Sequence, residues 1–163
     1  ANSAYYLGLL KDKEGKSNEA IGFYEQAIDL QSDNYEKAKL LYKIASKLKT
    51  KRSYGKARNY YRKALAANPS MGKAHLAIAQ MYAASANNCG ETTFNKRAVF
   101  WLAADEARRA GRVDPTLKKA SGQTVANYMS KAPQKADIFS EGNAGQTIRI
   151  GCWIGSSVTV PSL

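Results

Sequence analysis

The sequence predicts an all-α fold of stacked helix–turn–helix repeats, with a capping helix and a short C-terminal β-hairpin or extended tail. Three observations support this prediction. Apolar residues recur at helical spacing through most of the chain. The pattern of residues 38–71 reappears 37 residues earlier and 34 residues later, as expected for a repeat protein. Near the C-terminus the apolar period changes from 3.6 to two, which is typical of a strand.

The clearest repeat is the segment from Ala38 to Met71. Its apolar residues at helical spacing form two groups, first Leu41, Ile44, Ala45 and Leu48, and then Ala57, Tyr61 and Ala64. Asn68 and Pro69 end the second helix, because proline cannot continue it. One helix pair cannot bury its own apolar face, so we expect this pair to stack between related pairs.

Equivalent positions occur in both neighbouring segments. Small residues recur where two helices must approach closely, at Gly8, Ala20, Ala27, Ala45, Ala57, Ala64 and Ala79. Large residues recur where a side chain must fill the space between helices, at Leu7, Tyr24, Ile44, Tyr61 and Ile78. We therefore expect these side chains to pack between helices.

This alternation resembles the tetratricopeptide repeat, a 34-residue helical pair whose pattern ends in a proline. The resemblance extends over residues 1–115, although Leu41 replaces the usual tryptophan and Ser32 the first proline. It implies an α-α superhelix with repeats at residues 1–34, 35–71 and 72–115, the third interrupted by an inserted loop at residues 85–93. The chain enters directly into a repeat helix without a basic leader or cleavage site, which indicates the C-terminal fragment of a larger protein.

The second helix of the third repeat has two registers. It is expected from Phe94 to about Gly111. Counting from its start, Ala98 and Leu102 fit the inner positions of the repeat. Counting back from Pro115, the inner positions are instead Ala103, Ala107 and Ala110. Both registers remain open.

A capping helix is predicted at residues 116–132, because Asp114 and Pro115 form a helix start. Its inner face is predicted to consist of Leu117, Ala120, Thr124, Val125 and Tyr128. Residues 133–163 form a C-terminal extension with a hairpin at residues 147–160. A three-residue loop at 155–157 would place Ile154 opposite Val158 and Cys152 opposite Val160, giving one apolar face.

Cys89 and Cys152 are the only cysteines. One lies in the inserted loop and the other on the hairpin, the two places where the chain departs from the plain repeat. A bridge between them would close a loop of 63 residues and contribute roughly 3–4 kcal/mol. It would also require an oxidising compartment such as the cell envelope or periplasm, whereas two free thiols would fit the cytoplasm. The two alternatives remain open.

No catalytic constellation is evident, so no enzyme activity is predicted. His75, the only histidine, replaces an apolar packing position on a repeat helix, which favours a structural role. The sequence contains no phosphate-binding loop and no zinc spacing, so neither a cofactor nor a metal is expected. No apolar run approaches the roughly 18 residues of a transmembrane helix.

The positive charge is concentrated in one part of the chain. Between Lys37 and Gly90 there are twelve basic residues and no acidic residue, which accounts for the whole net charge of +12. Lysines four residues apart, such as Lys39 and Lys43, repel each other by a few tenths of a kcal/mol. We therefore expect something acidic to offset this repulsion, which could be another part of the full-length protein, an acidic peptide, an anionic lipid surface or nucleic acid.

In the resembling family, the first helix of each repeat lines a concave groove that holds a peptide or helix. The residues that this resemblance places in the groove are Tyr5, Leu9, Lys39, Tyr42, Lys43, Ser46, Lys49, Leu76, Gln80 and Ala83. Tyr5 and Leu9 stand where some members have a lysine and an asparagine that clamp a terminal carboxylate, so that binding mode is not expected here.

Three functions follow from these residues. The first is a non-enzymatic interaction or scaffold module that binds an acidic protein or peptide segment in a basic, tyrosine-bearing groove. The second is binding of nucleic acid or another polyanion through the acid-free stretch at residues 37–90, with tyrosines stacking on bases. In the third, the C-terminal hairpin offers an edge strand to a partner.

Overall fold

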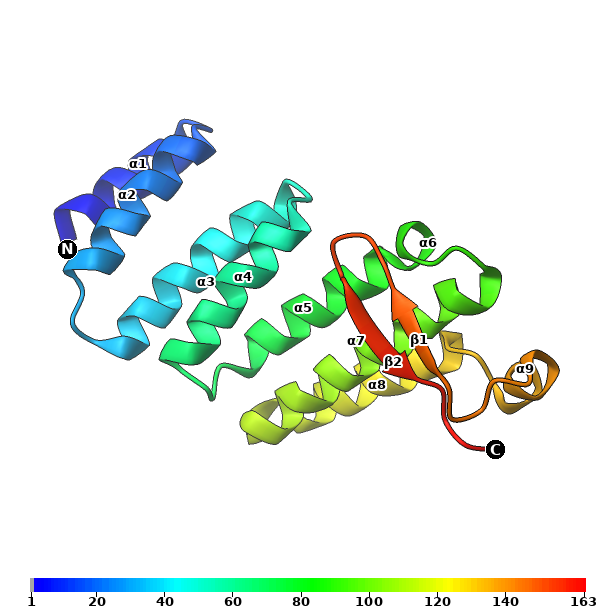
Figure 1. Cartoon of the computed structure of the whole chain (residues 1–163). Coiled ribbons are helices and arrows are strands. Elements are labelled where there is room, and N and C mark those ends of the chain that lie inside the picture. Colours follow the sequence, from blue (N-terminus) through cyan, green and yellow to red (C-terminus); the bar gives the residue numbers. More distant parts are fainter. Residues whose placement is uncertain (1) are drawn as a thin grey trace. The chain divides into compact units, whose positions relative to one another are not determined.

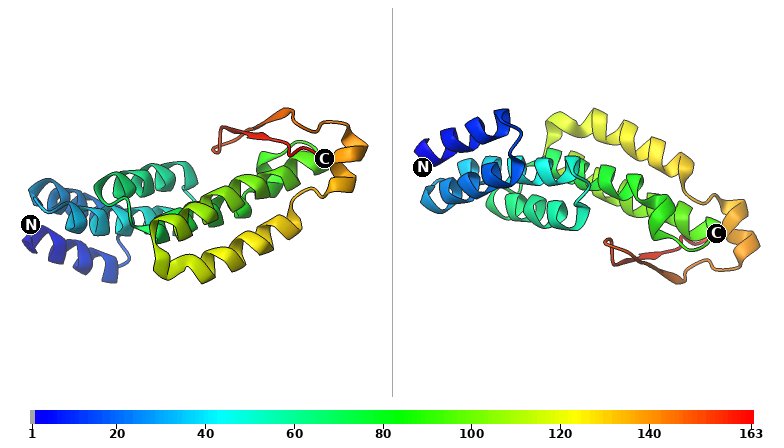
Figure 2. Two further views of the ribbon diagram at one scale, coloured as in Figure 1. Left: turned by 90° about the horizontal axis from the view of Figure 1, so that it is seen from below. Right: turned by 90° about the horizontal axis from the view of Figure 1, so that it is seen from above.

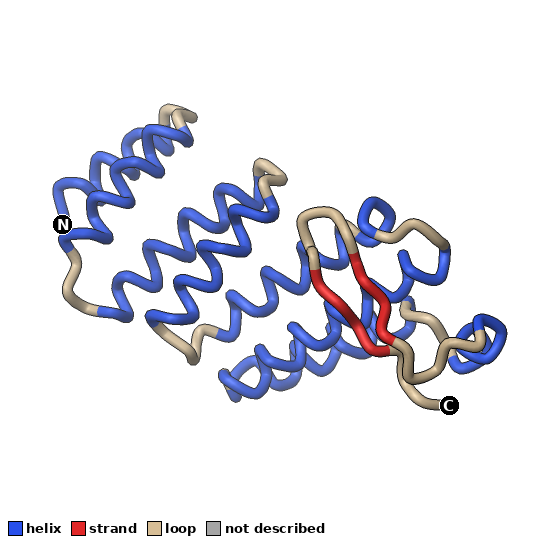
Figure 3. The backbone as a smooth tube through the Cα atoms, in the orientation of Figure 1, coloured by secondary structure: helices blue, strands red, loops and turns tan. Residues whose placement is uncertain are grey.

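The computed structural model describes residues 2–163, with side chains from Ser3 onward. The described chain is mainly helical and contains one two-stranded antiparallel sheet (Figures 1 and 3). It divides into two compact units, Ala1–Ala74 and His75–Leu163. The predicted fold class, an all-α helical repeat with a short C-terminal hairpin, is confirmed.

The first unit consists of two helix pairs. Helices α1 (Asn2–Lys13) and α2 (Ser17–Leu30) pack together, as do α3 (Asn34–Thr50) and α4 (Tyr54–Ala67), and α2 also contacts α3 (Figures 1 and 2). The turn between the pairs is closed by Asp33, whose carboxylate accepts hydrogen bonds from the peptide nitrogens of Tyr35 at 2.8 Å and Glu36 at 3.1 Å. This N-cap fixes where α3 begins. Helix α3 then packs against α2, so the second pair contacts the first.

The core between the two pairs combines large and small side chains. Tyr24 and Ile44 are fully buried, and they form one cluster with small residues of α1 and α2, namely Ala4, Ala20 and Ala27. Gly8 is required here, because a Cβ at that position would lie 2.5 Å from the Tyr24 ring. The alternation of small and large residues seen in the sequence thus corresponds to direct packing of helix on helix.

Leu7 departs from this pattern. It is 43% exposed, whereas Ile44, the equivalent residue in the next pair, is fully buried. Ile44 is buried because its helix stacks on the α1–α2 pair. No described helix packs on the corresponding face of α1, so Leu7 stays open together with Tyr6 and Leu10. The prediction that Leu7 packs between helices is wrong for the described residues.

The second unit is built around one long helix. Its helices are α5 (Gly72–Ala84, which begins in the first unit), α6 (Ala86–Cys89), α7 (Thr93–Val113), the 3-10 turn η1 (Pro115–Leu117), α8 (Lys118–Lys131) and α9 (Lys135–Glu141). Helix α7 lies between α8 and the hairpin (Figure 2) and also contacts α6. The predicted loop at residues 85–93 is wrong in part, because α6 forms a helical turn within it.

The ambiguous register of α7 has a structural explanation. Ala98, Ala103, Ala107 and Ala110 are all fully buried, while Leu102 is only half-buried. Because α8 packs on one side of α7 and the hairpin on another, the helix buries more than one face. Ala98 of the first register and the three alanines of the second are therefore all inner positions, and neither register alone describes the helix.

The capping helix α8 begins two residues later than predicted, after the 3-10 turn η1. Asp114 caps the 3-10 turn by accepting a hydrogen bond from the Thr116 peptide nitrogen at 3.0 Å. Ala120, predicted on the inner face, is exposed, and the neighbouring Ser121 is buried instead. Ser121 donates a hydrogen bond to the Ala107 carbonyl, and Gly111 leaves room for it. A polar residue thus occupies the closest approach of α7 and α8.

The C-terminal extension contains a helix that the sequence pattern did not predict. Helix α9 is only seven residues long, and it starts where the Gln134 peptide nitrogen donates to Asp137 at 2.7 Å. Arg97 of α7 forms an ion pair with the same Asp137 at 3.0 Å and donates to the Ala132 carbonyl at 2.9 Å. The short helix is therefore held by contacts with distant residues, which periodicity cannot reveal.

The hairpin pairs β1 (Thr147–Ile150) with β2 (Ser156–Thr159) in a register that differs from the prediction. Ile148 lies opposite Val158, and Ile150 lies opposite Ser156. The connection therefore runs over residues 151–155 instead of 155–157, and the predicted pairing of Cys152 with Val160 is wrong. Within the connection, the Gly155 peptide nitrogen donates a hydrogen bond to the Gly151 carbonyl at 3.2 Å. A disulfide also joins Cys152 to Cys89 of α6, with Cα atoms 5.2 Å apart.

Candidate functional site

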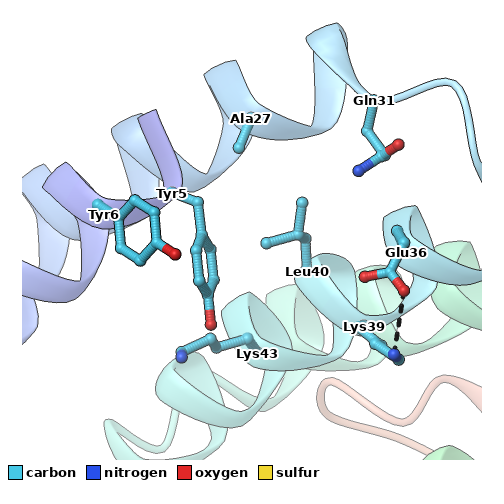
Figure 4. A pocket seen from close by; sticks show the side chains of 8 residues that line it. All are labelled: Tyr5, Tyr6, Ala27, Gln31, Glu36, Lys39, Leu40 and Lys43. Carbon is cyan, nitrogen blue, oxygen red and sulfur yellow. Dashed lines mark hydrogen bonds and ion pairs between the residues drawn. The ribbon is translucent and has the colours of Figure 1, made fainter. Parts of the chain in front are cut away.

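Three of the predicted groove residues line one pocket of the first unit. Tyr5 of α1 and Lys39 and Lys43 of α3 border a cavity of about 430 Å³ (Figure 4). The remaining lining residues are Tyr6, Ala27, Gln31, Glu36 and Leu40. The pocket therefore combines aromatic and aliphatic walls with two ammonium groups, a combination suited to a segment that carries both apolar and acidic side chains.

Tyrosine rings surround the ammonium group of Lys43. Its Nζ atom lies 5.3 Å from the centre of the Tyr5 ring and 5.4 Å from that of Tyr24. Such cation–π contacts are worth about 0.5–1 kcal/mol at exposed sites. Within residues 2–163, Lys43 has no carboxylate in ion-pair contact. Its charge thus remains available to a partner carboxylate.

The groove is less purely basic than the sequence suggested. Lys39 forms an ion pair with Glu36 at 3.1 Å, and Lys47 forms one with Asp12 of α1. Asp12 also accepts a hydrogen bond from the Tyr24 hydroxyl. Acidic residues of the chain itself therefore offset part of the repulsion, which is one of the alternatives that the sequence left open. Glu36 reaches Lys39 from one turn earlier on the same helix, whereas Asp12 reaches Lys47 because α1 and α3 come together.

Four other predicted groove residues of this unit lie outside the pocket. The Tyr42 ring meets the Tyr61 ring edge-on at a centroid distance of 5.3 Å, and Ser46 is 3.0 Å from the Tyr61 hydroxyl. Leu9 packs against the core cluster. Partial burial lowers the pKa of Lys49 below its usual value. Of the predicted groove residues in this unit, only Tyr5, Lys39 and Lys43 therefore line the pocket.

The predicted groove residues of α5 all belong to the second unit. Gln80 is exposed, and Leu76 and Ala83 are half-buried. The cavity beside Lys43 is lined by residues of the first unit alone.

His75 lies in a charged network. Its Nδ1 atom is 2.8 Å from the Glu106 carboxylate, which also accepts a hydrogen bond from Arg109 at 3.0 Å. Glu106 is only 6% exposed. A buried carboxylate needs such partners, because an unpaired charge in the interior is strongly destabilising. The pairing of α5 with α7 through these groups accounts for the single histidine without catalysis.

Sequence reasoning missed several lining residues for a definable reason. Leu40 precedes the inner position Leu41 and lies off the predicted inner stripe, yet stacking of the pairs leaves it only 8% exposed. Tyr6 and Gln31 occupy no key position of the repeat. Only the junction between α1, α2 and α3 brings these side chains together, so no spacing along the chain marks them.

The buried tyrosine beside the groove predicts a loss of stability at alkaline pH. Burial raises the pKa of Tyr61 to about 12, from a usual value of 10.0. Its contribution to stability is therefore fully present below pH 10 and is lost as the pH rises from about 10 to about 12, because the unfolded chain ionises first. Urea midpoints across this range should fall more steeply for the unchanged protein than for Tyr61→Phe. Equal slopes would contradict the expectation.

The sequence is similar to proteins that are named for an assembly function. It is 33% identical over 107 residues to the photosystem I assembly protein Ycf3 of Cyanophora paradoxa, covering 60% of this chain and 62% of that protein. Ycf3 of Cuscuta gronovii and of Cuscuta obtusiflora are each 29% identical over 107 residues, with 64% of their length covered. The chain thus spans less than two thirds of the length of each relative. No family model matches the sequence.

A helix crosses a bilayer only if it is long and apolar enough. Among residues 2–163, none of the helices combines enough length with enough apolar character to span a membrane.

Proposed function

We propose that this chain is a non-enzymatic interaction module that holds an acidic segment of a partner protein during assembly. The observation that carries the proposal is the pocket in which Tyr5, Lys39 and Lys43 converge. Aromatic and aliphatic side chains form its walls, so an apolar residue of the partner can be buried there. An adjacent acidic residue of the partner would then reach the Lys43 ammonium.

The electrostatics favour a carboxylate close to Lys43. Tyrosine rings stabilise the ammonium through their faces but do not neutralise it. Lys39 already shares its charge with Glu36. A partner carboxylate would therefore gain most from Lys43, with Lys39 as a second, weaker contact. A hydrogen bond to a charged group contributes about 1.5–3 kcal/mol when it is shielded from water.

The similarity to Ycf3 supports the general role. Those relatives are named for the assembly of photosystem I. The resemblance of the repeats to the tetratricopeptide pattern supports the same class of function, since such repeats hold extended segments on one face. These two lines of support and the pocket all favour a scaffold that binds protein.

Charge reversal in the pocket tests the proposal. The double variant Lys39→Glu with Lys43→Glu should weaken binding of a fluorescein-labelled 12-residue peptide that alternates glutamate with leucine. We expect a loss of tenfold or more, or about 1.4 kcal/mol, in fluorescence polarisation titrations. Loss of the Lys43 contacts with the rings should cost about 1 kcal/mol of stability, so circular dichroism should still show a folded protein.

The matched control reverses two exposed charges on α4. Lys56→Glu with Arg62→Glu makes the same change in net charge, and both side chains lie outside the pocket. This control should change the peptide affinity less than twofold. Equal losses from the two double variants would contradict the pocket.

The same two variants distinguish the second function. Nucleic acid would respond to both, because its affinity follows the number of phosphates neutralised and falls steeply with salt. A 20-nucleotide single strand that binds at micromolar concentration in physiological salt, and is weakened equally by both variants, would favour polyanion binding over the acidic peptide.

A further inference from the structure

The outer edge of β2 carries peptide groups without partners. Val160 donates from its peptide nitrogen to the Gln146 carbonyl at 2.8 Å, and its own carbonyl accepts from Gly145 at 2.9 Å. The peptide groups of Val160 therefore point toward β1. Residues alternate along an antiparallel strand, so those of Ser157 and Thr159 point away from β1. Within residues 2–163, no hydrogen bond satisfies them.

A pocket of the second unit adjoins this edge. It has a volume of about 350 Å³ and none of its lining residues belongs to β1. The lining residues are Trp101, Leu102, Asp105, Arg108, Met129, Ser157, Val158, Thr159 and Pro161. Its apolar part is made by α7, α8 and the inward side of β2. Asp105 and Arg108 are paired at 2.6 Å and exposed, so they contribute a neutral polar rim.

We propose that β2 is a second interaction surface, which binds an extended segment of another protein as a third strand. Open peptide groups at a strand edge are satisfied most fully by another extended backbone. Side chains of the added strand would alternate, and those facing α7 would enter the pocket. The apolar walls select a residue such as leucine, isoleucine or valine at that position.

The short length of the edge argues for a reversible partner and against fibre-like self-association. Pro161 has no peptide N–H, so the open edge offers donors only at Ser157 and Thr159. Natural proteins limit edge pairing by such short strands and prolines. Four hydrogen bonds together with one buried side chain give moderate affinity, because the net contribution of each hydrogen bond is small once the lost hydrogen bonds to water are counted.

The hairpin is fastened so that the edge keeps its position. Besides the disulfide, the Trp153 ring stacks on Tyr82 at 5.4 Å, and its Nε1–H donates to the Ser85 hydroxyl at 2.9 Å. These contacts hold the connection between the strands on α5 and α6. A preorganised edge loses less conformational entropy when a segment binds.

A phage-displayed library of random 12-residue peptides, selected on the whole chain, tests the inference. We expect enriched peptides with an apolar residue flanked by residues that favour strands. Thr159→Pro removes one outward N–H without removing a hydrogen bond of the hairpin, and should weaken these peptides at least tenfold in fluorescence polarisation. Thr147→Pro is the matched control, because Thr147 lies directly opposite Thr159 on the other edge. It should change the affinity less than twofold.

A second measurement uses the unchanged protein. Synthetic peptides can be N-methylated at alternate residues in two patterns. Only the pattern that removes the N–H groups donating to β2 should abolish binding. Peptide binding should also survive Lys39→Glu with Lys43→Glu, so this proposal and the groove proposal can fail separately. The inference is overturned if no enriched peptide depends on Thr159, if both proline variants have equal effects, or if the edge is instead occupied by a second copy of the chain.

Discussion

Replacing Tyr61 with alanine is expected to lower the free energy of unfolding by about 3–5 kcal/mol, as is typical of large buried aromatic residues. Tyr61 is only 1% exposed. It packs edge-on against Tyr42 and shares a hydrogen bond with Ser46 at 3.0 Å. The substitution would open a cavity between α3 and α4 and leave Ser46 without this partner. Urea denaturation followed by helical circular dichroism measures the change.

Two controls separate packing from the hydroxyl. Tyr61→Phe keeps the ring and should cost only about 0.5–1.5 kcal/mol, the usual net value of one hydrogen bond. Tyr35→Ala removes a tyrosine that is 64% exposed and should change stability by less than about 0.5 kcal/mol. If Tyr61→Ala resembled Tyr35→Ala, the helical pair would not be held together by the Tyr61 side chain.

Removing the disulfide is expected to destabilise the second unit by about 3–4 kcal/mol. The bridge between Cys89 and Cys152 closes 63 residues of chain, and its loss frees the unfolded state to explore more conformations. Cys89→Ser with Cys152→Ser should also loosen the loop that carries Trp153. Tryptophan emission should then shift to longer wavelength, because stacking on Tyr82 weakens and water reaches the ring.

Reduction provides the matched comparison. Dithiothreitol should destabilise the unchanged protein by a similar amount and should leave the double serine variant unaffected. Intact mass after alkylation without reduction identifies the state of the two cysteines. Two alkylated cysteines in unreduced protein from an oxidising host would contradict the bridge.

Local patterns were sufficient for the helical pairs and for most of their inner faces. Ala20, Tyr24, Ile44 and Tyr61 could be predicted as buried because helical periodicity and the repeat spacing depend only on residues close together in the chain. The change to a period of two likewise predicted a strand pair near the C-terminus. The residues of the pocket could be predicted only in part, since Tyr5, Lys39 and Lys43 follow from repeat position.

Tertiary structure decided the features that depend on distant residues. Asp12 of α1 neutralises Lys47 of the acid-free stretch because distant helices come together, and charge along the chain cannot show this. The hairpin register was decided by the helices that hold Cys152 and Trp153, which left only four residues in each strand to pair. Periodicity specifies which face of an element is apolar. Which neighbour covers that face, or leaves it open as at Leu7, is determined only when the elements pack.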